Sequence, residues 1–84
     1  MRLAVLLAAA ALLAAPSVRA LTYPKDCKAA TLRSAASKGG CSVENGAKHH
    51  KVMKGGAQVT LIPNSVKQNG TCRSIISAIN SSCQ

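Results

Sequence analysis

Four cysteines most constrain the fold of this chain, because the rest of the sequence can form only a small core. The chain has 84 residues, no Phe, no Trp and one Tyr. A domain of this size is marginal unless it is cross-linked. An even cysteine count in a short secreted chain is typical of a disulfide framework. Neither a CxxC nor an HxxxH spacing occurs, so no metal site or cofactor is predicted, and we expect two disulfides formed among Cys27, Cys41, Cys72 and Cys83.

The first twenty residues have the pattern of a secretory signal peptide. A basic start at Met1-Arg2 is followed by an unbroken apolar run, Leu3–Ala15, which is too short to span a bilayer. Val18 and Ala20 occupy the −3 and −1 positions of a cleavage site. We therefore expect residues 1–20 to be a signal peptide and residues 21–84 to form one small domain, secreted into an oxidising extracellular compartment.

The expected mature domain is strongly cationic. Removing Arg2 and Arg19 with the signal peptide lowers the formal net charge from +9 to +7. Only two acids, Asp26 and Glu44, oppose the basic side chains. A charge of this size favours association with anionic partners.

Two helices are predicted at the ends of the domain. Cys72, Ile75, Ile76, Ile79 and Cys83 recur at the spacing of one helical face, which predicts a helix with Thr71 as its N-cap. A first helix is expected from about Cys27, capped by Asp26, to Gly39-Gly40.

The middle of the chain reads as strands. Residues 49–54 and 57–62 flank Gly55-Gly56, which suits the φ > 0 positions of a tight hairpin turn. Alternation of Ala57, Val59 and Leu61 with polar residues predicts that these three face the core. Residues 41–44 form a further candidate strand, and residues 21–25 a lead-in or edge strand. The predicted core comprises Leu32, Val43, Val52, Met53, Val59, Leu61, Ile62, Val66, Ile75, Ile76 and Ile79.

The helix spacing limits the disulfide pairing. Cys72 and Cys83 lie about 16 Å apart along an intact helix, beyond the reach of a disulfide. Of the two remaining pairings, Cys27–Cys83 with Cys41–Cys72 suits antiparallel helices and is preferred. Cys27–Cys72 with Cys41–Cys83 suits parallel helices and stays open. The fold class is therefore α+β, with two helices packed on a small antiparallel sheet and stapled by two disulfides.

The Ala/Leu-rich leader, the 64-residue mature part and the cysteines near both of its ends resemble small secreted cysteine-rich effector proteins of filamentous fungi. The element order is similar to that of the killer-toxin-like members, whose ferredoxin-like domain packs two helices on a small antiparallel sheet. The chain departs from them in having only four cysteines and no final strand. The resemblance implies a virulence-associated protein that acts on a host.

One local cluster is the candidate binding site for an anionic surface. Lys48, Lys51 and Lys54 recur every three residues and, with His49 and His50, form the densest basic segment. Adjacent strand residues point to opposite faces, so the two histidines are not expected to chelate one ion. Only two acids are available to pair with them in general acid-base catalysis, so no catalytic residues are predicted.

We therefore expect a non-enzymatic, effector-like binding protein, monomeric, whose partner is a host protein or an anionic cell-surface component. The alternative is a cationic antimicrobial or killer toxin that perturbs anionic membranes. Nucleic acid is disfavoured, because Tyr23 alone cannot build a stacking platform. Asn69 and Asn80 begin two candidate N-glycosylation sequons.

Overall fold

The computed structural model describes residues 20–84, so the predicted signal peptide falls outside the described residues except for Ala20. Two helices flank three strands in the order αβββα, which confirms the predicted α+β class. The elements are α2 (Ala29–Lys38), β1 (Ser42–Asn45), β2 (His49–Lys54), β3 (Ala57–Pro63) and α3 (Gly70–Ser82).

The three strands form an antiparallel sheet in the order β1-β2-β3. The turn between β2 and β3 contains Gly55 and Gly56, with φ angles of 59° and 81°. Two consecutive positive φ values match the sharp two-residue turn that the glycine pair predicts. Residues 21–25, considered as an edge strand, form no strand and instead lead into a turn.

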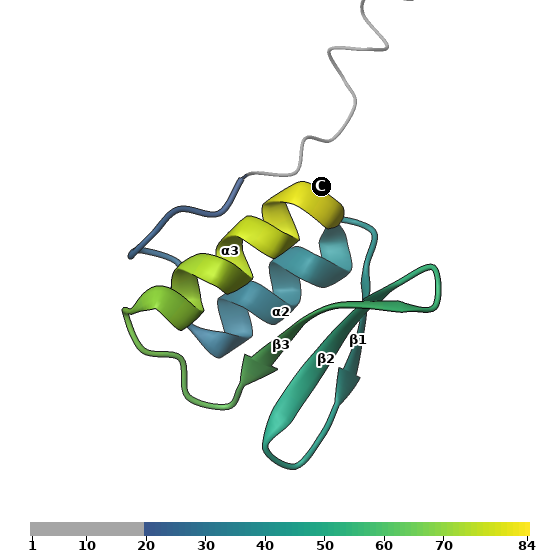
Figure 1. Cartoon of the computed structure of the whole chain (residues 1–84), viewed down its shortest axis with the longest axis horizontal. Coiled ribbons are helices and arrows are strands. Elements are labelled where there is room, and N and C mark those ends of the chain that lie inside the picture. Colours follow the sequence, from purple (N-terminus) through teal and green to yellow (C-terminus); the bar gives the residue numbers. More distant parts are fainter. Residues whose placement is uncertain (1–19) are drawn as a thin grey trace, which may run out of the picture.

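The two helices run side by side in the same direction (Figure 1). The odd number of strands between them explains this arrangement. Each antiparallel strand reverses the chain, so β3 ends at the edge of the molecule where α2 begins. α3 therefore starts beside the start of α2.

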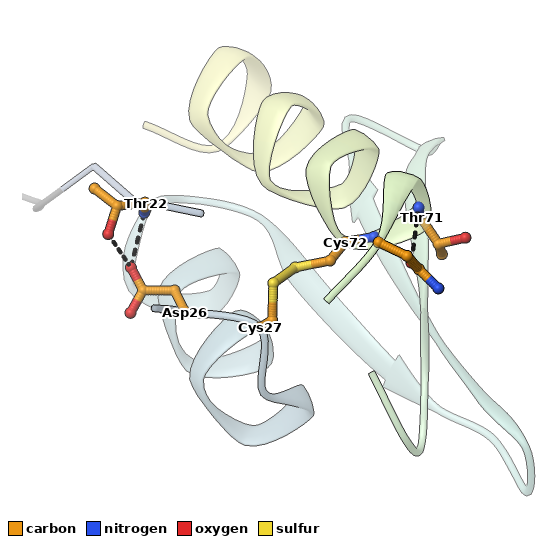
Figure 2. Close-up of a disulfide and its surroundings, with 6 residues drawn as sticks. Thr22, Asp26, Cys27, Thr71 and Cys72 are labelled. Carbon is orange, nitrogen blue, oxygen red and sulfur yellow. Dashed lines mark hydrogen bonds between the residues drawn. A yellow bond between two sulfur atoms is a disulfide. The ribbon is translucent and has the colours of Figure 1, made fainter. Parts of the chain in front are cut away.

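The helix direction decides the disulfide pairing. Cys27 bonds to Cys72, with Cα atoms 5.8 Å apart, and joins the starts of the two helices (Figure 2). Cys41 bonds to Cys83 at a Cα separation of 5.3 Å and joins their ends. The preferred pairing, Cys27–Cys83 with Cys41–Cys72, is therefore wrong, because it requires antiparallel helices. The exclusion of a Cys72–Cys83 bridge is confirmed.

The core lies between the helix pair and one face of the sheet. Leu32 and Ala36 of α2 are buried with the three isoleucines of α3, and they pack with Val52 of β2 and Ile62 of β3. Both disulfides belong to the same cluster. Burial of this kind contributes about 1.5–3 kcal/mol for each large aliphatic side chain.

Two residues that were predicted to face the core, Ala57 and Leu61, are exposed. Leu61 is 39% exposed, whereas its neighbour Ile62 is fully buried. An irregularity in the β2–β3 register at Val52/Met53 leaves Val59 as an extra residue on β3. The strict alternation breaks there, so Val59 packs against the core but Leu61 faces solvent.

Both predicted N-caps are also wrong. The cap of α3 is Asn69, whose Oδ1 accepts hydrogen bonds from the N–H groups of Thr71 (3.0 Å) and Cys72 (3.4 Å). Asn69 thereby satisfies two N–H donors in the first turn of the helix, which is the capping role that the sequence assigned to Thr71. The N-cap position of α2 is held by Lys28, which makes no side-chain cap bond. Asp26 instead closes the preceding turn (Figure 2).

Candidate anionic-surface site

The five residues of the predicted basic cluster do not form one surface. Lys48 lies in the turn before β2, and the other four occupy β2. His49 and Lys51 are exposed, whereas His50 and Val52 are buried. The alternation of the strand therefore divides the cluster between the open face of the sheet and the core.

His50 is part of the fold rather than of an open surface. Its side chain is only 8% exposed. Its Nδ1 lies 2.8 Å from Oδ1 of Asn45, the residue opposite it on β1. Because His49 faces solvent, the expectation that the two histidines point to opposite faces is confirmed. Within residues 20–84, no group of three or more His, Cys, Asp or Glu side chains is arranged to hold a metal ion.

Lys51 and Lys54 have different surroundings. Lys51 lies on the open face, with Glu44 opposite it on β1 and Leu61 opposite it on β3. Lys54 donates from Nζ to the backbone carbonyl of Ser82, at 2.6 Å, near the end of α3. A cation at this position is favoured by the partial negative charge of the last helical carbonyls.

The whole described surface is cationic. Of the eleven Lys and Arg in the chain, all but Arg2 and Arg19 lie in the described part, which leaves nine. Of the two acids, Asp26 is only 4% exposed, and its Oδ2 accepts hydrogen bonds from the N–H and Oγ1 of Thr22. Glu44 is therefore the only acidic side chain that is exposed to solvent.

An open hollow of about 350 Å³ lies between α2 and β1. Arg33 is its charged group, and Nε of this arginine donates to the carbonyl of Ala29 at 3.4 Å. The sequence gives no indication of this hollow, because its walls come from a helix and a strand that only the fold places together. The lining residues are Ala30, Arg33, Ser34, Ser37, Val43 and Asn45.

A second feature absent from the sequence analysis lies beside the Cys27–Cys72 bridge. The guanidinium carbon of Arg73 sits 4.3 Å from the centre of the Tyr23 ring. This is cation–π geometry, which holds the arginine over the ring while its charge remains exposed. The two residues are 50 positions apart, so no local pattern indicates their contact.

The two sequons have different environments. Asn69 is exposed, and its cap uses only Oδ1. Asn80 uses both side-chain atoms, since Oδ1 accepts from the N–H of Leu21 and Nδ2 donates to the carbonyl of Leu21. Modification of Asn80 at Nδ2 requires loss of this pairing, whereas modification of Asn69 leaves the capping oxygen in place. Glycosylation itself stays a prediction at both positions.

Comparison of the chain with protein-family models, with curated proteins and with solved structures gave no match. In residues 20–84, none of the helices has both the length and the apolar character needed to cross a membrane.

Proposed function

We propose that this protein is a secreted, non-enzymatic, effector-like binding protein that acts at a host interface by associating with an anionic component. The observation that carries the proposal is the charge balance of the folded surface. Residues 20–84 carry nine basic side chains but only one exposed acidic side chain, Glu44. The two disulfides fit an extracellular protein, because such bonds persist in oxidising compartments.

The rival function, lysis of anionic membranes, has less support from the surface. Among the described residues, Leu61 is the one large apolar side chain that is exposed. Ile75, Ile76 and Ile79 of α3 are buried in the core. A membrane-active helix places such residues in the lipid interface, with several cations on its other face. Attraction to an anionic surface is therefore better supported than insertion into it.

The test uses the oxidised protein, produced from the full chain in the bacterial periplasm so that it carries no glycan. Association is measured with vesicles of phosphatidylcholine, with vesicles that also contain phosphatidylserine, and with beads that carry polygalacturonate. We expect association with at least one of the two anionic materials. It should fall sharply between about 0.1 and about 1 M salt, because the Debye length falls from about 10 to about 3 Å.

Failure to associate with both anionic materials at low salt would contradict the proposal. Dye leakage from the phosphatidylserine vesicles at micromolar protein would instead support the toxin function. Equal association with neutral and anionic vesicles would show that charge is not what drives binding.

A further inference from the structure

The basic side chains are unevenly placed along the helix pair. Four exposed cations gather where both helices begin, close to the Cys27–Cys72 bridge. Lys28 and Arg73 are the direct neighbours of the two bonded cysteines. We call these four residues the basic end: Lys25, Lys28, Lys67 and Arg73.

Backbone hydrogen bonds hold the other two cations near this bridge. The N–H of Cys27 donates to the carbonyl of Pro24 at 3.2 Å, which folds the turn containing Lys25 against the bridge. The N–H of Asn69 donates to the carbonyl of Lys67 at 3.0 Å, and Asn69 caps the helix turn that contains Cys72. Figure 2 shows the Thr22–Asp26 turn on one side of the bridge and Thr71 on the other.

Three cations elsewhere on the surface have compensating surroundings. Lys54 donates to the carbonyl of Ser82 at the end of α3. Lys38 lies in the last turn of α2, where helical carbonyls carry partial negative charge. Lys51 lies opposite Glu44 across the β1–β2 pair. In each case the surroundings offset part of the positive charge.

The basic end carries four exposed cations against a single nearby carboxylate, that of Asp26. Neither α2 nor α3 has an acidic residue in its first turn. The nearby Asp26 carboxylate is buried and turned toward Thr22. Because the helices are parallel, the partial positive charges of both helix starts add to the field of the four cations. A cation at a helix start lowers the stability of the helix, so helix formation does not explain why Lys28 occupies the N-cap position of α2.

The shape of the basic end fits a broad surface better than an enclosed ligand. Its four side chains are all exposed, on two loops and two helix starts. The hollow between α2 and β1 is lined by none of them. The long side chains of lysine and arginine can contact mobile lipid headgroups without a binding groove. Leu61, the exposed apolar side chain that could insert into lipid, lies elsewhere, on the open face of the sheet.

We propose that the basic end docks the protein on a membrane surface rich in anionic phospholipid, by peripheral contact without insertion. This inference rests on the proposed function and names its partner and contact surface. It also moves the contact from the predicted cluster on β2 and the turn before it to the loops and helix starts that flank the Cys27–Cys72 bridge.

Two variants of equal charge test the docking surface. The first replaces three cations of the basic end, Lys25→Gln, Lys28→Gln and Lys67→Gln. The matched control replaces Lys38→Gln, Lys51→Gln and Lys54→Gln, so that each variant loses three positive charges. Arg73 is retained in both because it contacts Tyr23. Lys48 is also retained, because its carbonyl is bonded to the N–H of Asn64 near the same loop as Lys67.

The measurement is partitioning of the oxidised full-chain product onto vesicles with and without phosphatidylserine, at about 0.1 M salt, where surface attraction is only partly screened. Each basic residue near an anionic surface contributes about fivefold to partitioning, so the first variant should bind about 100-fold more weakly. The control should lose less than about tenfold, because its cations are not at the contact. Unfolding transitions by circular dichroism establish that both variants are folded.

Three results would overturn the inference. Equal losses in the two variants would show that only net charge matters, and a larger loss in the control would return the contact to the hairpin side. Binding of the unmodified protein to polygalacturonate beads but not to phosphatidylserine vesicles would refute the lipid partner and leave the proposed function standing. Binding to neither material would refute the proposed function as well.

Discussion

Leu21 and Asn80 are joined by two hydrogen bonds across 59 positions of the chain. The N–H of Leu21 donates to Oδ1 of Asn80 at 2.9 Å, and Nδ2 of Asn80 donates to the carbonyl of Leu21 at 3.0 Å. The Leu21 side chain is buried in the core beside this pair. The start of the described domain is therefore fastened to the last turns of α3.

Replacing Asn80→Ala should lower the free energy of unfolding by about 1–3 kcal/mol, because it leaves two partly buried backbone groups of Leu21 without partners. The measurement is urea unfolding of the oxidised protein, followed by circular dichroism. Ser82→Ala is the matched control, since it also removes the second sequon but keeps Asn80. Equal stability of the two variants would show that the Leu21–Asn80 pair contributes nothing.

The cap of α3 gives a second prediction. Asn69→Ala should reduce stability by about 1 kcal/mol, because the N–H groups of Thr71 and Cys72 lose their acceptor. Asn69→Asp should retain the stability of the unmodified protein, since its carboxylate can accept the same bonds and is favoured at a helix start. Both variants remove the first sequon, so a glycan cannot explain a difference between them. The measurement is the thermal midpoint of each variant. A midpoint of Asn69→Ala at or above that of Asn69→Asp would contradict this assignment of the cap.

Gly39 is placed so close to the end of α3 that a methyl group there would overlap the carbonyl oxygen of Cys83. Its φ of −83° suits any residue, so the effect of substitution is purely steric. Gly39→Ala should therefore destabilise the protein by about 1–3 kcal/mol, the range seen for overpacked sites. Gly70→Ala, at a position with open space, is the control and should change little or stabilise α3. Similar urea midpoints for the two variants would disprove the close contact.

The disulfide pairing can be read directly from a tryptic digest of the unreduced protein. We expect the peptide 26–28 to be linked to 68–73, and the peptide 39–48 to be linked to 74–84. The antiparallel pairing would instead join 26–28 to 74–84. Mass spectrometry before and after reduction distinguishes these products, and detection of the second set would refute the parallel arrangement.

The elements that local patterns specify were predicted well. The buried face of α3 follows from the regular spacing of three isoleucines and two cysteines, and the Gly55-Gly56 turn follows from the backbone freedom of glycine. Both depend on neighbours within a few residues. The α+β class then follows from the order of these elements.

Apart from the two N-caps, which were misplaced by two residues each, the failures arise where distant segments meet. The disulfide pairing depends on the number of strands between the helices. Two antiparallel strands would leave the helices antiparallel, and the addition of β1 as one more strand makes them parallel. The exposure of Leu61 depends on an irregular register with β2 that alternation along one strand does not reveal. The Leu21–Asn80 pair and the Arg73–Tyr23 contact join positions at least 50 residues apart, and no local pattern marks either of them.

The predicted site failed to form one surface for a related reason. The site was predicted because its five basic residues are close together in the sequence. Successive side chains of a strand point to opposite faces, so His50 is buried while His49 and Lys51 are exposed. The basic end is drawn from two stretches of sequence, 25–28 and 67–73, which the Cys27–Cys72 bridge brings together.

The parallel helices and their two bridges make a closed covalent ring. It runs from Cys27 along α2 to Cys41, across to Cys83, back along α3 to Cys72 and across to Cys27. Residues 42–71, which include the sheet, form a loop attached to this ring at two points. A protease could cut that loop once, or remove most of it with two cuts, and the two helices would remain covalently joined at both ends. The Cys27–Cys72 bridge would still join the neighbours Lys28 and Arg73, and a single cut would leave all four cations of the basic end on one covalent framework.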